Sequence, residues 1–142
     1  MAFREKIAWL NFGALIVAYA AYFGVVGRTA EFGKNNLVDI IWSFGPLAVV
    51  HAIVVIVGSI AIAIASANDA KRPTDERDRA IVQRSNTAGY YTLLVGTLLV
   101  AVVMPFSEPS YKIVNVGLAV VVFAEMLRSG VILVSYRRGW HG

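Results

Sequence analysis

The chain has no cysteine among its 142 residues, and only 15% of those residues are charged. The absence of cysteine excludes a disulfide framework, a thiolate metal site and a cysteine nucleophile. About a quarter of the residues in soluble domains are charged, whereas 58% of this chain is hydrophobic. A soluble domain of this size has too little interior to cover so much apolar surface. A soluble enzyme, a disordered tail and a nucleic-acid partner are therefore excluded.

Signals for catalysis and for cofactors are also missing. His51 and His141 are the only histidines, too few for a zinc site or for a bis-histidine haem within one chain. The sequence contains no glycine-rich phosphate-binding loop. An intramembrane enzyme would have to rely on His51 and Glu125, which fall in different apolar runs and have no nucleophile beside them. We therefore expect a non-enzymatic protein without a metal or cofactor.

The chain does contain four long apolar runs, at about 7–27, 44–66, 86–106 and 112–136. Each is 21 to 25 residues long, and a helix needs about 20 residues to cross the hydrocarbon core of a bilayer. The runs do not alternate as barrel strands do, and a helix satisfies its own backbone polar groups in lipid. The sequence predicts one all-α domain over 1–142, a four-helix transmembrane bundle of two hairpins.

Two features of the first and second runs can be tested against a structure: where the second helix begins, and whether the first run forms a helix. The second run is expected to begin at Phe44, which places Pro46 in the first turn of its helix, where proline costs little. The first run follows a basic segment, as a cleaved signal peptide would. It continues long enough to span the bilayer, so we expect it to be a retained helix.

The distribution of lysine and arginine predicts the orientation. Nine of these residues lie on the side shared by both termini and the 67–85 loop, and three lie on the other side. The first group is Arg4, Lys6, Lys71, Arg72, Arg77, Arg79, Arg84, Arg137 and Arg138, and the second is Arg28, Lys34 and Lys112. Basic residues are retained in the cytoplasm. We expect a multi-pass protein of the cell inner membrane with both termini and the loop cytoplasmic.

The 67–85 loop contains a predicted helix start. Thr74 is the expected N-cap, Asp75 and Glu76 suit the positive end of the helix dipole, and Asp75 can pair with Arg79 at i,i+4. The third helix should therefore extend about three turns beyond its apolar run. The charged turns are either a solvated start that sets topology or a docking surface for a cytosolic or membrane protein partner. The docking candidates are Asp75, Glu76, Arg77, Asp78, Arg79 and Arg84.

The segment DERDRAIVQR at 75–84, followed by the pair Tyr90-Tyr91, resembles a known group of proteins. It is similar to a family of small, functionally uncharacterised prokaryotic membrane proteins that share a DERD-x-x-I motif between two helical hairpins. The motif residues here are Asp75, Glu76, Arg77, Asp78 and Ile81, and the 136–139 segment YRRG is similar to the tail of that family. The resemblance implies the four-helix fold and a membrane location, and it implies no particular activity.

Three ionisable residues fall inside the apolar runs, where charge is costly and often functional. They are His51, Glu125 and Arg128. Glu125 and Arg128 are three residues apart on one helix and can pair. We expect a polar layer at their depth that contains Asn11, Tyr90 or Tyr91, Glu125 and Arg128. The pair either fixes helix register or provides a titrating carboxylate for a small proton-coupled transporter.

His51 and the small residues leave further alternatives open. His51 is expected to hydrogen-bond to Tyr22 or to a backbone carbonyl, although a symmetric dimer could pair two copies of it. Small residues recur every four positions at Ser59, Ala63 and Ala67 and at Ala88, Thr92 and Gly96. Such stripes allow close helix contacts, within the bundle or in a homodimer.

These observations favour one function over its rival. We expect an interaction, sensor or accessory protein of the membrane that acts through its charged cytoplasmic loop, because catalytic motifs are absent. The alternative is a small proton-coupled transporter that uses the Glu125–Arg128 pair.

Overall fold

A computed structural model describes residues 3–28, 36–67 and 75–138 of the chain. It contains four long helices: α1 (Phe3–Arg28), α2 (Leu37–Ala65), α4 (Glu76–Leu98) and α5 (Ser110–Arg137). α4 continues through a π-helical turn, Leu99–Val103, and a 3-10 turn, Met104–Phe106. No strand occurs in these three ranges. The predicted all-α four-helix fold is confirmed.

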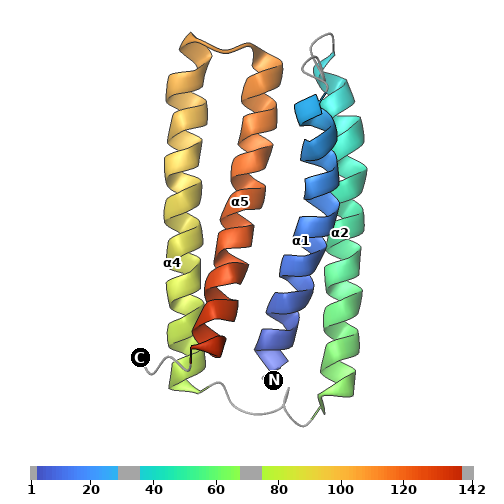
Figure 1. The fold of residues 1–142 in the computed structure, drawn as a ribbon, viewed down its shortest axis with the longest axis vertical. Coiled ribbons are helices and arrows are strands. Elements are labelled where there is room, and N and C mark those ends of the chain that lie inside the picture. The colour runs from blue at the N-terminus through green and yellow to red at the C-terminus, as the bar shows by residue number, and fades with distance from the viewer. Residues whose placement is uncertain (1–2, 29–35, 68–74, 139–142) are drawn as a thin grey trace.

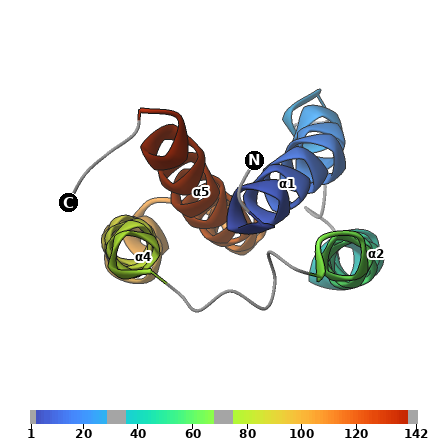
Figure 2. The same ribbon diagram turned by 90° about the horizontal axis from the view of Figure 1, so that it is seen from below.

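The helices form two antiparallel hairpins, α1 with α2 and α4 with α5 (Figure 1). The hairpins meet where α5 packs against α1. Seen from the end, the order across the molecule is α4, α5, α1, α2, with α4 and α2 at the two ends of an arc (Figure 2). Within the described ranges, α2 and α4 share no extended interface. The bundle is therefore open on the side between α2 and α4.

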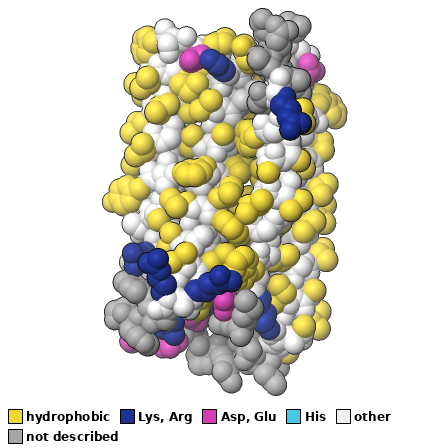
Figure 3. Space-filling model, viewed as in Figure 1, with side chains coloured by type: hydrophobic (Ala, Val, Ile, Leu, Met, Phe, Trp, Pro, Cys, Tyr) yellow, Lys and Arg dark blue, Asp and Glu magenta, His cyan; other side chains and the backbone are white. Residues whose placement is uncertain are grey.

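All four helices are long and apolar enough to cross a membrane. The most apolar is α2, whose best 18-residue window has a mean hydropathy of 2.8 and no buried residue. Most of its large apolar side chains are exposed and would be covered by lipid rather than by protein. An apolar belt covers the middle of the molecule, and the charged side chains gather near its two ends (Figure 3). These features support a multi-pass membrane protein.

The start of α1, the end of α2, the start of α4 and the end of α5 lie at one end of the molecule, which we call the basic end (Figure 1). The described basic residues of these segments are Arg4, Lys6, Arg77, Arg79, Arg84, Arg137 and Arg138. Arg28 and Lys112 belong to the opposite end. Lys34, Lys71 and Arg72 lie outside the described residues. The described helix ends that flank both termini and the 67–85 connection therefore lie together, whereas the membrane orientation stays a prediction.

α2 begins seven residues earlier than predicted, at Leu37 instead of Phe44. Its N-cap is Asn36, whose side chain accepts a hydrogen bond from the Val38 N–H at 3.0 Å. The prediction failed because Asp39 and Ser43 interrupt the apolar run. The Ser43 hydroxyl donates to the carbonyl of Asp39, so this polar side chain is satisfied within the helix.

The earlier start also changes the position of Pro46. It lies inside α2 instead of in the first turn. Proline has no N–H, so the carbonyl of Trp42 loses its usual partner four residues later. The helix nevertheless continues to Ala65, so the missing hydrogen bond does not end it.

The start of α4 is close to the prediction but has a different cap. Thr74 lies outside the described residues, and Asp75 is the N-cap. The Asp75 carboxylate accepts a hydrogen bond from the Glu76 N–H at 2.7 Å, a role for which aspartate is as well suited as threonine. The helix then precedes Asn86 by about three turns, as expected.

Small residues allow α4 and α5 to approach closely. A Cβ atom added at Gly96 would overlap both methyl groups of Val120, the second at 2.9 Å. The side chain of Val120 is β-branched and has little rotational freedom, so it cannot turn away from the added atom. The overlap can therefore be relieved only by moving a helix. The predicted stripe on α4 therefore serves packing within the chain at Gly96.

We predict that Gly96→Ala destabilises the fold by about 1–3 kcal/mol, the usual cost of overpacking. The control is Gly13→Ala in α1, where an added Cβ meets nothing within 4 Å and the higher helix propensity of alanine should be neutral or stabilising. Thermal unfolding in detergent, followed by circular dichroism, measures the difference. Equal midpoints for the two variants would contradict the close contact.

Candidate functional site

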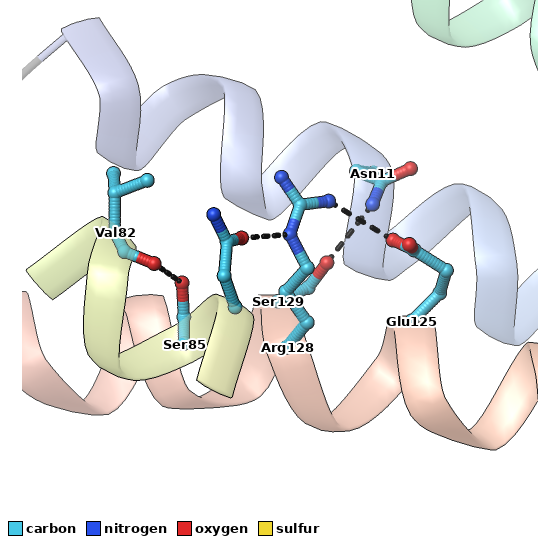
Figure 4. A network of polar contacts seen from close by, with 7 residues as sticks. Asn11, Val82, Ser85, Glu125, Arg128 and Ser129 are labelled. Atoms are coloured by element: carbon cyan, nitrogen blue, oxygen red, sulfur yellow. Dashed lines mark hydrogen bonds and ion pairs between the residues drawn. The ribbon is translucent and has the colours of Figure 1, made fainter. Parts of the chain in front are cut away.

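A network of polar side chains joins three helices toward the basic end (Figure 4). Asn11 of α1 donates from Nδ2 to the Ser129 Oγ of α5 at 2.9 Å. Arg128 of α5 donates from Nε to the Asn86 Oδ1 of α4 at 2.8 Å. The same guanidinium donates from Nη1 to Glu125 Oε2 at 3.1 Å. The predicted pairing of Glu125 with Arg128 is confirmed, and Asn11 lies in the same layer.

Asn86 and Ser129 were not identified from the sequence. Asn86 stands at the first position of an apolar run, and Ser129 follows Arg128 directly. Ser129 is 2% exposed, and a buried hydroxyl needs a partner. Asn11 in the first apolar run and Ser129 in the fourth lie at a similar distance from the basic end. Matching polar residues of different runs by this depth would have suggested Asn11 as the partner of Ser129.

Tyr90 and Tyr91 were expected in this layer, and that prediction is wrong. Their side chains are 61% and 59% exposed, and their rings contact each other at a centroid distance of 5.6 Å. In the described part of the chain, neither hydroxyl bonds to the network. The two tyrosines lie just inside the apolar segment on the outer surface of α4, where amphipathic rings favour the membrane–water interface.

The expected hydrogen bond from His51 to Tyr22 is also not formed. The Tyr22 hydroxyl donates to Asn115 Oδ1 of α5 at 3.1 Å, because α1 lies between α2 and α5 and turns this residue toward α5. His51 instead packs edge-on against Tyr19, with ring centroids 5.5 Å apart. His51 Nε2 is buried without a hydrogen-bond partner among the described residues, so the backbone alternative fails as well.

The DERD segment forms internal contacts on one face of α4. The Tyr136 hydroxyl at the end of α5 donates to Asp78 Oδ1 at 2.6 Å. Arg4 Nε of α1 lies 3.9 Å from Asp78 Oδ2. Ile81 and Ser85, on the same side of α4, are fully buried. We call the Asp78–Tyr136–Arg4 contacts the clasp, since they join the beginnings of α1 and α4 to the end of α5.

The remaining charged residues of this segment differ in their surroundings. Asp75 caps α4, and Arg79 contacts it through a backbone hydrogen bond of 3.1 Å instead of the expected side-chain pair. Arg77 is half-buried, with its Nε lacking a partner in the described ranges. Glu76, Arg79 and Arg84 are exposed. Apart from the cap residue Asp75, three of the six docking candidates therefore lie at the surface of α4.

Two adjoining clefts lie beside the network. The central cleft, of about 480 Å³, is lined by residues of all four helices, including Asn11, Val55, Val82 and Glu125. The α4 cleft, of about 680 Å³, is lined by Arg4, Arg79, Val82, Gln83, Asn86, Thr87, Tyr90 and Tyr91. Arg4 and Val82 line both clefts. The Glu125 and Arg128 side chains are 47% and 39% exposed, so the pair is reachable from the central cleft.

The described ranges give little support for a metal site or for a second polar site between α4 and α5. They contain no group of three histidine, aspartate or glutamate side chains that could hold a metal ion. A hollow of about 820 Å³ between α4 and α5 is lined almost wholly by apolar side chains, with Thr92 and Tyr91 the exceptions. It offers no titratable pair and is a furrow in the apolar belt. The polar network and the clasp are the arrangements on which a function can be argued.

We predict that Tyr136→Phe loosens the first turns of α4, because it removes the donor to Asp78. A hydrogen bond to a charged group contributes about 1.5–3 kcal/mol, so amide hydrogen exchange over residues 76–85 should accelerate by ten-fold or more. Tyr90→Phe is the matched control, since that hydroxyl is exposed. Unchanged exchange in Tyr136→Phe would show that the clasp contributes nothing to the order of this segment.

Comparisons with family models, with curated proteins and with solved structures give no match for this chain. The resemblance of the 75–84 segment to a membrane-protein family therefore stays a prediction, and the function is argued from geometry alone.

Proposed function

We propose that this chain is a non-enzymatic integral membrane protein that acts as an interaction, sensor or accessory subunit. Its partner is a cytosolic or membrane protein that binds the outer face of the first three turns of α4. The supporting observation is the division of these turns into two faces. Asp78, Ile81 and Ser85 are held internally, while Glu76 and Arg84 are exposed.

The internal contacts make this surface suitable for docking. A segment that is ordered before binding does not lose further conformational freedom when a partner arrives. The clasp and the buried Ile81 hold the extension against α1 and α5. The Asn86–Arg128 hydrogen bond then continues the contact into the membrane-spanning part. A partner at Glu76 or Arg84 would therefore meet a rigid charged surface.

The proposed orientation places this surface in the cytoplasm of a cell with an inner membrane. The supporting observation is the concentration of arginine and lysine at the basic end. Basic residues close to the ends of spanning helices set topology through the positive-inside rule. Both termini and the beginning of α4 would then be cytoplasmic.

Proton-coupled transport through Glu125 is the alternative, and flux through liposomes containing Glu125→Gln would test it. The exposure of Glu125 to the central cleft is compatible with it. However, the carboxylate is already hydrogen-bonded to Arg128 at 3.1 Å, and this arrangement suits a fixed structural pair better than a proton carrier. We therefore favour interaction.

The orientation can be measured directly because the chain lacks cysteine. We predict that Ser110→Cys, at the end opposite to the basic end, reacts with a membrane-impermeant maleimide in intact cells. Ala67→Cys, just beyond the end of α2, should react only after the membrane is permeabilised. Both positions are exposed, so accessibility within the fold does not confound the comparison. Reversed labelling would overturn the orientation.

Docking predicts that the double variant Glu76→Ala/Arg84→Ala loses a stoichiometric partner. The measurement is affinity purification from native membranes in mild detergent, with mass spectrometry of the associated proteins. Alanine at Asp75 or Asp78 is avoided, because it would remove the helix cap or the clasp and confuse docking with folding.

The matched control is Glu108→Ala/Lys112→Ala. This pair has the same charges, is linked by a 2.7 Å ion pair and lies at the opposite end of the molecule. It should retain the partner. Retention of the partner by both double variants, or the absence of any stoichiometric partner of the unaltered chain, would refute the proposal.

A further inference from the structure

The open side of the bundle has an unusual distribution of charge. The side chains that line the central and α4 clefts include three arginines, Arg4, Arg79 and Arg128, and one glutamate, Glu125, which gives a net charge of +2. Glu125 already pairs with Arg128, and Arg4 lies near Asp78. Arg79 is exposed and forms no ion pair among the described residues. Asp78 offsets the charge of Arg4, so the described side chains at the two clefts retain a net positive charge, which lies at Arg79.

The depth of this charge matches the headgroup region of a bilayer. Asn86 lies at the first position of the apolar run, and Arg79 precedes it by two helical turns, or about 10 Å. The interfacial layer on each side of the hydrocarbon core is about 5–8 Å thick, and an arginine side chain is long enough to reach along it. Gln83 lines the same cleft, and its side-chain amide supplies hydrogen-bond donors between these levels.

The clefts adjoin apolar surface on the membrane side. Leu93 and Leu94 follow Tyr90 by one turn of α4 and are 38% and 40% exposed. Val55 of α2 lines the central cleft. Because α2 and α4 share no extended interface, the space between them must be filled in a bilayer, since an empty gap would forfeit the contacts of both surfaces.

We propose that these two clefts bind one anionic phospholipid. Its phosphate lies at Arg4 and Arg79, near Asn86, and its acyl chains lie between α4 and α2. Basic pockets between spanning helices on the cytoplasmic side are suited to anionic headgroups, and guanidinium groups bind phosphate in a bidentate manner. The adjoining apolar surface selects a lipid over a free phosphate, because only a lipid occupies both parts of the site.

The experiment uses the full chain purified in mild detergent, with native mass spectrometry to measure bound lipid. The probes are dioleoyl phosphatidylglycerol, dioleoyl phosphatidylcholine and inorganic phosphate. One phosphatidylglycerol should bind with clear preference over phosphatidylcholine, which has the same acyl chains. Arg79→Gln should weaken that binding about five-fold, the equivalent of about 1 kcal/mol for one basic residue near an anionic surface.

Arg84→Gln is the matched control, because Arg84 is an exposed arginine on the same helix that lines neither cleft. It should change affinity less than two-fold. Arg4→Gln, tested as a second variant, should weaken binding as Arg79→Gln does, with folding checked by circular dichroism.

Three results would overturn the proposal. They are equal binding of phosphatidylglycerol and phosphatidylcholine, equal losses in Arg79→Gln and Arg84→Gln, and displacement of the lipid by millimolar inorganic phosphate alone. The proposal is independent of protein docking, since the double variant at Glu76 and Arg84 leaves all the arginines that line the two clefts in place.

Discussion

The structure depends on the ability of α5 to satisfy polar groups on two neighbouring helices at once. α5 lies between α1 and α4, and Ser129 accepts from Asn11 while Arg128 donates to Asn86. In a hydrocarbon environment, an unsatisfied polar group costs more than in water because no solvent replaces the lost partner. These bonds therefore restrict the rotation of α5 about its axis, and with it the position of each hairpin relative to the other.

The helices could be predicted because the length of an apolar run is a direct consequence of bilayer thickness. Their boundaries were harder to predict. The start of α2 was missed because Asp39 and Ser43 look like the polar residues of a connection. Within the helix, the hydroxyl of Ser43 returns to a carbonyl one turn earlier. Hydropathy records that a side chain is polar and does not record whether the helix itself satisfies it.

Among the contacts of the candidate site, the sequence correctly predicted only the one between two residues of the same helix. Glu125 and Arg128 are three residues apart, so helical periodicity alone brings them together. Contacts between helices require knowledge of how each helix is rotated, and helices that are apolar all round give little indication of it. This explains why Tyr22 was assigned to His51 instead of Asn115, and why Tyr90 and Tyr91 were placed inside the bundle.

The clasp also bears on the biogenesis of the protein. Tyr136 follows Asp78 by 58 residues, and synthesis proceeds from the N-terminus. The hydrogen bond can therefore form only after both helices of the second hairpin have been made. Until then, the Asp78 carboxylate lacks its closest partner. Closure of the clasp is thus a late event that distinguishes a fully inserted chain from an unfinished one.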